Sequence, residues 1–135
     1  MATEGPAFHD GSQCTAGVTF ASTTGAGPSG SGQFLAVSLS TTGAQRTINL
    51  ATTGADIYGI MQNKPAVGAS ADVCFLGVCK AVAGSTLTAG SVLQVGTSGT
   101  LIPTSAGVKG VAVALESVTA ASQIFTVMVQ KFGTQ

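Results

Sequence analysis

The sequence has no tryptophan, one tyrosine and one histidine, and only 7% of its residues carry a charge, whereas about 25% is usual in soluble domains. Five basic residues balance five acidic ones, and they stand singly, without a basic patch. This distribution argues against electrostatic attachment to nucleic acid or to an anionic membrane. A weakly charged, neutral surface also tends to associate, so we expect partner proteins to cover part of it.

Long apolar runs are missing as well. No stretch of the chain approaches the ~18 uninterrupted apolar residues that a membrane span requires. Met1 is not followed by a basic segment and an apolar segment, which together characterise a secretory leader. We therefore expect a protein that is made in the cytoplasm and has no membrane partner.

Cysteine is scarce, and two of the three cysteines, Cys74 and Cys79, lie in one apolar stretch. In an extended strand they stand about 16 Å apart and on opposite faces, whereas a disulfide requires Cα atoms within ~7 Å. Only a sharp break at Gly77 would bring them together. A C-x4-C pair without a second Cys or His pair nearby does not match zinc-site spacing. We predict two buried, inert thiols.

The sequence also lacks a set of residues that could together carry out catalysis. His9 and Cys14 lie in the N-terminal segment, which is the part of the chain least able to hold a geometry, and there is no G-x-S-x-G motif. The carboxylates Asp56, Asp72 and Glu116 are each isolated in the sequence. We therefore predict no catalytic, cofactor-binding or metal-ligating residues, no cofactor and no enzyme activity.

Residues 1–32 differ in composition from the rest of the chain. They are rich in Gly, Ser and Thr and too poor in large apolar groups to fold alone. We expect an extended arm, in which only 17–22 can pair as a strand. Residues 25–30 match G-x-G-x-x-G formally, but Pro28 and a Gly/Ser run stand where a dinucleotide site requires a helix.

From residue 33 onward, short runs of Val, Ile, Leu, Phe and Thr are bounded by Gly, Asp, Asn or Pro. This is the pattern of strands and turns, and Gly99 marks a hairpin turn. Any helix is limited to one or two turns near 117–122. The pattern predicts an all-β body with strands at 33–40, 46–50, 57–62, 72–82, 91–95, 100–103, 108–115 and 123–130.

Alternation along the strands predicts which side chains face the core. Within 33–40, Leu35, Val37 and Leu39 form the apolar face, and the opposite face is expected to be wetter. The strand over 123–130 is apolar on both sides, so we expect it to be covered on both faces. The strand over 72–82 is expected to be central, with Gly77 as a bulge and with core residues Val73, Phe75, Leu76, Val78 and Val82.

An ordered series of short motifs runs through this body. It consists of Gly59 with "QNKPAVG" (62–68), "GVCKAVAG" (77–84), "LTAGSVLQV" (87–95), Gly99 and "KGVAVALE" (109–116). In this series the chain resembles the capsid decoration, or cement, proteins of tailed bacteriophages. The resemblance covers residues 33–130.

The resemblance implies a compact β-sandwich or β-barrel-like body (β-tulip or β-clip-like) at 33–135, with an extended arm at 1–32. It also implies a function without catalysis. Similar proteins are virion components that bind the outer surface of the head and stabilise contacts between major capsid protein subunits, often as homotrimers.

Two other functions stay open at this point. One is a carbohydrate- or receptor-binding β-module on a virion surface, whose usual mark is a cluster of exposed aromatic side chains. The other is a small enzyme with a β-clip-like core, because residues 83–93 are similar to sugar-acid and antifreeze-like domains. The lack of a convergent His, Cys or carboxylate set counts against the enzyme.

Overall fold

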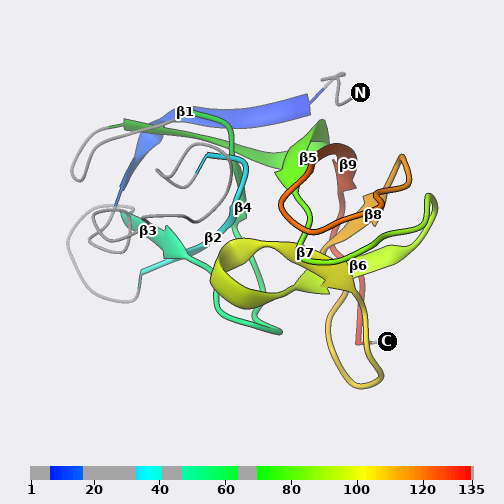
Figure 1. Cartoon of the computed structure of the whole chain (residues 1–135). Helices are drawn as coiled ribbons and strands as arrows, with labels where there is room; N and C mark the ends of the chain where they lie inside the picture. Colours follow the sequence, from blue (N-terminus) through cyan, green and yellow to red (C-terminus); the bar gives the residue numbers. More distant parts are fainter. Residues whose placement is uncertain (1–6, 17–32, 41–46, 64–69, 135) are drawn as a thin grey trace.

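The computed structural model describes residues 7–16, 33–40, 47–63 and 70–134. Within these ranges the chain is all-β, and no helix is long and apolar enough to cross a membrane. The nine strands belong to one sheet (Figure 1). They are β1 (Ala7–Ala16), β2 (Ala36–Leu39), β3 (Thr47–Leu50), β4 (Gly59–Met61), β5 (Ser70–Val82), β6 (Val92–Val95), β7 (Leu101–Pro103), β8 (Ala112–Ala114) and β9 (Ile124–Val129).

The sheet has the strand order β1-β3-β2-β4-β5-β9-β8-β6-β7, and β1 also pairs with β5. The first five strands in this order therefore form a closed ring of pairings. The other four continue from β5 through β9. In Figure 1 the long strand β5 runs beside β1 and then turns towards β9. Because β5 belongs to both parts, its conformation decides how the two parts are joined.

All eight strands that the sequence predicted in the body are present, and the all-β fold is confirmed. No helix forms near 117–122, where the sequence would have allowed one or two turns, since residues 119–122 form bends and turns. Val118 and Leu87 exchange two backbone hydrogen bonds of 2.9 Å, and this bridge uses the groups that a helix would need. The described helical turn is instead a 3₁₀ turn at Thr97–Gly99, in the predicted β6–β7 hairpin.

Strand β1 lies in the segment that was expected to be an extended arm. It pairs antiparallel with β5 and parallel with β3, although its sequence, AFHDGSQCTA, contains few of the β-branched and aromatic residues that favour strands. The expected strand at 17–22 lies outside the described residues. The division into an arm at 1–32 and a body at 33–135 stays a prediction.

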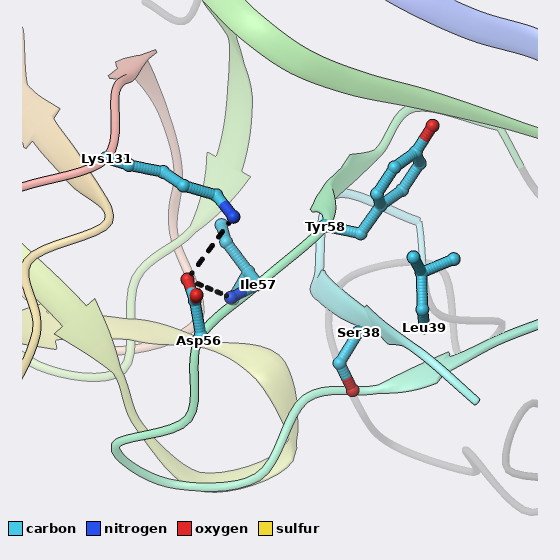
Figure 2. Close-up of a pocket in the computed structure, with 6 residues that line it drawn as sticks. All are labelled: Ser38, Leu39, Asp56, Ile57, Tyr58 and Lys131. Atoms are coloured by element: carbon cyan, nitrogen blue, oxygen red, sulfur yellow. Dashed lines mark hydrogen bonds and ion pairs between the residues drawn. The ribbon is translucent and has the colours of Figure 1, made fainter. Parts of the chain in front are cut away.

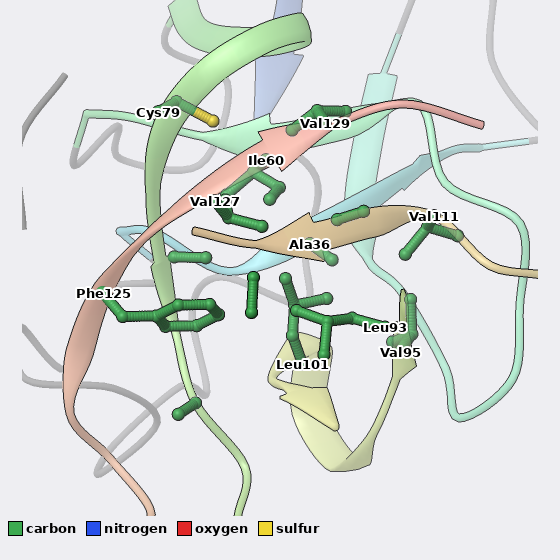
Figure 3. Close-up of a cluster of buried hydrophobic side chains, with 14 of the residues drawn as sticks. Ala36, Ile60, Cys79, Leu93, Val95, Leu101, Val111, Phe125, Val127 and Val129 are labelled. Carbon is green, nitrogen blue, oxygen red and sulfur yellow. The ribbon is translucent and has the colours of Figure 1, made fainter. Parts of the chain in front are cut away.

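Two apolar cores lie on opposite sides of a wall formed by β2, β4 and β5. Neighbouring residues on each strand point opposite ways, so that one joins the larger core and the next joins the smaller core. Figure 3 shows the larger core, where Phe125 is the largest fully buried side chain. Ala36, Ile60 and Cys74 belong to the larger core, and Val37, Met61 and Val73 belong to the smaller one.

In the segment 33–40, the buried and exposed side chains differ from those that the sequence predicted. Ala36 is fully buried, on the face predicted to be wetter, because β2 has a core on each side. Leu39, predicted to be on the apolar face, is 45% exposed. It is the last residue of β2 and pairs with Ile48 of β3. The strand β9, in contrast, is covered on both faces as predicted.

A break in β5 changes the direction of its side chains. The pairing of β5 with β1 skips Phe75, so β5 has a bulge there. The bulge lies two residues before the predicted position, Gly77, which has φ +103° and pairs in register with Ala7 and Val129. Phe75 and Leu76 are therefore 40% and 43% exposed, and their predicted place in the core is wrong. Val73 and Val82 are buried as predicted, whereas Val78 is only partly buried.

The same break places Cys74 and Cys79 in one core, although their odd spacing predicted opposite faces. Both side chains are fully buried. We expect the double variant Cys74→Ala with Cys79→Ala to lose about 2 kcal/mol of unfolding free energy, because each change removes a buried sulfur and leaves a small cavity. Urea unfolding under reducing conditions measures this loss.

The matched variant Cys74→Val with Cys79→Val retains more side-chain volume and should lose less stability. An unchanged urea midpoint in the double alanine variant would show that the thiols add nothing to the core.

Candidate functional site

An open pocket of about 270 Å³ lies where three distant segments meet (Figure 2). The first is the end of β2, the second is the loop that leads into β4, and the third is the chain just after β9. The pocket is lined by Ser38, Leu39, Asp56, Ile57, Tyr58 and Lys131.

One side of the pocket is charged. The Asp56 carboxylate lies 3.6 Å from Nζ of Lys131 and 3.8 Å from Nζ of Lys109, and it accepts a 2.9 Å hydrogen bond from the backbone N–H of Ile57. Both lysine side chains are more than half exposed, so solvent screens these pairs and each stabilises the fold only slightly. Lys131 lines the pocket, whereas Lys109 pairs with Asp56 from outside the lining. Together the two cations and one carboxylate give this region a net charge of about +1.

The other side of the pocket is apolar, as Figure 2 shows for Leu39 and Tyr58. The Tyr58 ring stacks against Phe75, with ring centroids 6.4 Å apart and an angle of 28° between the planes. We call Leu39, Tyr58 and Phe75 the Leu39–Phe75 surface. Exposed apolar groups that gather beside a pocket are typical of protein or ligand binding sites.

The residues considered for catalysis from the sequence do not converge in the described part of the chain. Asp56 lines the pocket, whereas Glu116 lies elsewhere and accepts a 3.1 Å hydrogen bond from the backbone N–H of Thr126. Asp72 stands in β5, where its carbonyl accepts a hydrogen bond from Gln62. The described residues contain no group of three potential metal ligands. The structure does not describe the side chains of His9 and Cys14.

Sequence reasoning did not single out Leu39, Tyr58 or Lys131 as neighbours. Leu39 fitted the apolar face of a strand, and Lys131 was one of several isolated charges. The only local signal was that Tyr58 is the sole tyrosine of the chain. The pocket exists because β2, β4 and β9 belong to one sheet, and no motif records that arrangement.

Comparisons with known proteins identify a solved structure that has a similar fold. No protein-family model and no curated protein sequence matches the chain. Among solved structures, the chain is similar to the N base of head fiber gp8.5 in bacteriophage phi29, with a TM-score of 0.66. The chain shares its fold with a phage head-fiber base. The similarity covers 95% of this chain and 99% of the other, at 16% sequence identity.

This likeness spans nearly the whole of both chains, so the fold is shared as a unit. At 16% identity it establishes the fold and transfers no residue roles. The similar structure belongs to a phage head protein, which agrees with the broad class that the sequence motifs indicated.

Proposed function

We propose that this protein is a structural component of a bacteriophage head that binds the major capsid protein on the outer surface. The main support is the fold shared with a head-fiber base over 95% of the chain. The ordered motifs between 59 and 116 support the same class independently. A low charge content suits a protein that coats a shell and avoids the packaged DNA.

In this proposal the protein works mechanically, as a decoration or cement protein, and catalyses no reaction. It ties neighbouring capsid subunits together, and it does so as a homotrimer. A trimer engages several subunits at once, so that modest single contacts combine through effective concentration. The exposed apolar side chains Leu39, Phe75, Leu76 and Leu115 provide surface for such contacts.

Heads that lack the protein provide the test. Purified protein should bind them at saturable, symmetric positions, and the decorated heads should withstand higher temperature or pressure before they release DNA. Electron microscopy locates the added density, and heads that already carry the protein serve as the control. Density inside the shell, or only on the tail, would contradict the proposal. Binding without any gain in heat or pressure tolerance would support attachment alone and refute the cement role.

A carbohydrate- or receptor-binding β-module is the second candidate, and the pocket is the observation that favours it. It combines an aromatic ring, a carboxylate and a hydroxyl, from Tyr58, Asp56 and Ser38. These groups can pack against the apolar face of a sugar and bond its hydroxyls. One face of the Tyr58 ring already lies against Phe75, however, which leaves a small aromatic platform.

A further inference from the structure

We propose that the pocket and the adjoining Leu39–Phe75 surface bind a segment of a protein partner in which an acidic residue stands beside a large apolar residue. The partner's carboxylate binds between Lys109 and Lys131, and its apolar side chain covers Leu39 and Tyr58. That this partner is a capsid subunit rests on the proposed function. The chemistry of the site does not depend on it.

The cationic side of the pocket has hydrogen-bonding capacity to spare. Each lysine ammonium carries three N–H donors, and its contact with Asp56 uses at most one of them. The Nζ–O distances of 3.6 and 3.8 Å are longer than the ~2.8 Å of a strong charge-assisted bond. A second carboxylate would therefore complete a site with two cations and two anions, in which every charge has a partner.

The apolar side lies within reach of the same segment. Leu39 and Phe75 are close to half exposed, and Tyr58, which contacts Phe75, lines the pocket together with Leu39. The stacked rings limit each other's motion, so little side-chain entropy is lost when a partner covers them. Tyrosine at the centre of such a surface is typical of binding hot spots.

The sheet holds both sides of the site in place. The backbone N–H of Tyr58 donates a 2.8 Å hydrogen bond to the carbonyl of Val37 in β2, and Phe75 stands at the bulge of β5. Lys131 follows β9, which pairs with β5 over six positions. A site carried by paired strands is formed before the partner arrives.

The net positive charge favours an acidic protein segment over a neutral sugar, because a neutral sugar would leave the second cation without a counter-charge. It also disfavours a second copy of this chain as the partner. Among the acidic residues whose side chains are described, Asp56 belongs to the pocket itself, Asp72 is partly buried in β5, and Glu116 already accepts a hydrogen bond from the backbone N–H of Thr126.

Nuclear magnetic resonance titration of the full chain tests the site directly. The probe is the capped peptide acetyl-Ala-Phe-Asp-Leu-Asp-Ala-amide, and the matched peptide carries Asn in place of both Asp residues. We expect saturable shifts of the amide signals of Tyr58 and Lys131 with the acidic peptide. Binding of the Asn peptide should be at least tenfold weaker.

The variants Lys131→Gln and Leu39→Ser should each weaken peptide binding about tenfold, and both positions are exposed, so the fold should persist. Lys80→Gln removes the same charge outside the pocket, where Lys80 lies 5.9 Å from the centre of the Phe34 ring, and should bind normally. Equal affinity of all variants would overturn the inference. So would shifts at the pocket with maltohexaose alone, or self-association that Leu39→Ser abolishes in sedimentation.

Binding to phage heads separates this inference from the proposed function. If wild-type protein binds heads and the two pocket variants bind equally well, the pocket is not the contact surface and the inference is wrong, while the proposed function stands. If the peptide binds at the pocket but heads do not bind the protein, the proposed function fails and the site remains. Loss of head binding in the two variants, but not in Lys80→Gln, supports both.

Discussion

Replacing Gly99 with alanine should lower the free energy of unfolding by about 3–5 kcal/mol, which is a large loss for a single methyl group. Gly99 has φ +78°, a conformation that costs an L-residue about 1–2 kcal/mol. A Cβ atom there would also stand 2.7 Å from the carbonyl oxygen and 3.2 Å from the nitrogen of Ala36. Both atoms are backbone within the buried wall, so they cannot move aside cheaply.

Gly107 provides the matched control. Its φ of +82° is nearly the same, but a Cβ atom there would meet nothing within 4 Å. Gly107→Ala should therefore lose only the conformational cost, about 1 kcal/mol. Urea unfolding of the two variants isolates the contribution of close packing. Equal losses of unfolding free energy in the two variants would show that packing of the turn at Thr97–Gly99 against β2 does not stabilise the fold.

Removing residues 1–16 should have a still larger effect. Strand β1 pairs with β5 at six positions and with β3 at two, so its loss opens the closed ring of five strands. The unpaired edge of β5 would then expose backbone N–H and C=O groups and the neighbouring Phe75 and Leu76. We expect a loss comparable with the ~5–15 kcal/mol that stabilises a whole domain, together with aggregation.

Thermal melting followed by circular dichroism, with size-exclusion chromatography, measures this effect. A chain that lacks only residues 1–6 keeps β1 and serves as the control. An unchanged melting temperature and a monodisperse peak after removal of residues 1–16 would mean that β1 is not part of the cooperative fold. In that case the whole segment 1–32 would behave as the arm that the sequence predicted.

The candidate site depends little on these stability effects, because its residues lie on the surface. Leu39, Phe75 and Lys131 are all exposed, so their substitution should change binding much more than folding. Gly99→Ala, in contrast, would affect binding only through the folded fraction. The two groups of variants therefore separate a defect in recognition from a defect in stability.

The sequence by itself determined the fold class and the position of eight strands. These are local properties: β-branched and aromatic residues favour extended backbone, and Gly, Asp, Asn or Pro end each run. The sequence indicates the hairpin at Gly99 because a tight turn requires glycine, whereas the bulge expected at Gly77 lies at Phe75. The scarcity of charge and of metal-ligating residues favours structural and binding functions over catalysis.

Only the tertiary structure decided which faces are buried and where a site can form. Ala36 is buried because β2 lies between two cores, and Cys74 and Cys79 share one core because a bulge changes the alternation of β5. Strand β1 forms because β5 and β3 offer it backbone partners. The pocket joins residues 38–39, 56–58 and 131, which meet only through pairing between strands far apart in sequence. Periodicity describes neighbours along the chain, whereas these features depend on neighbours across the sheet.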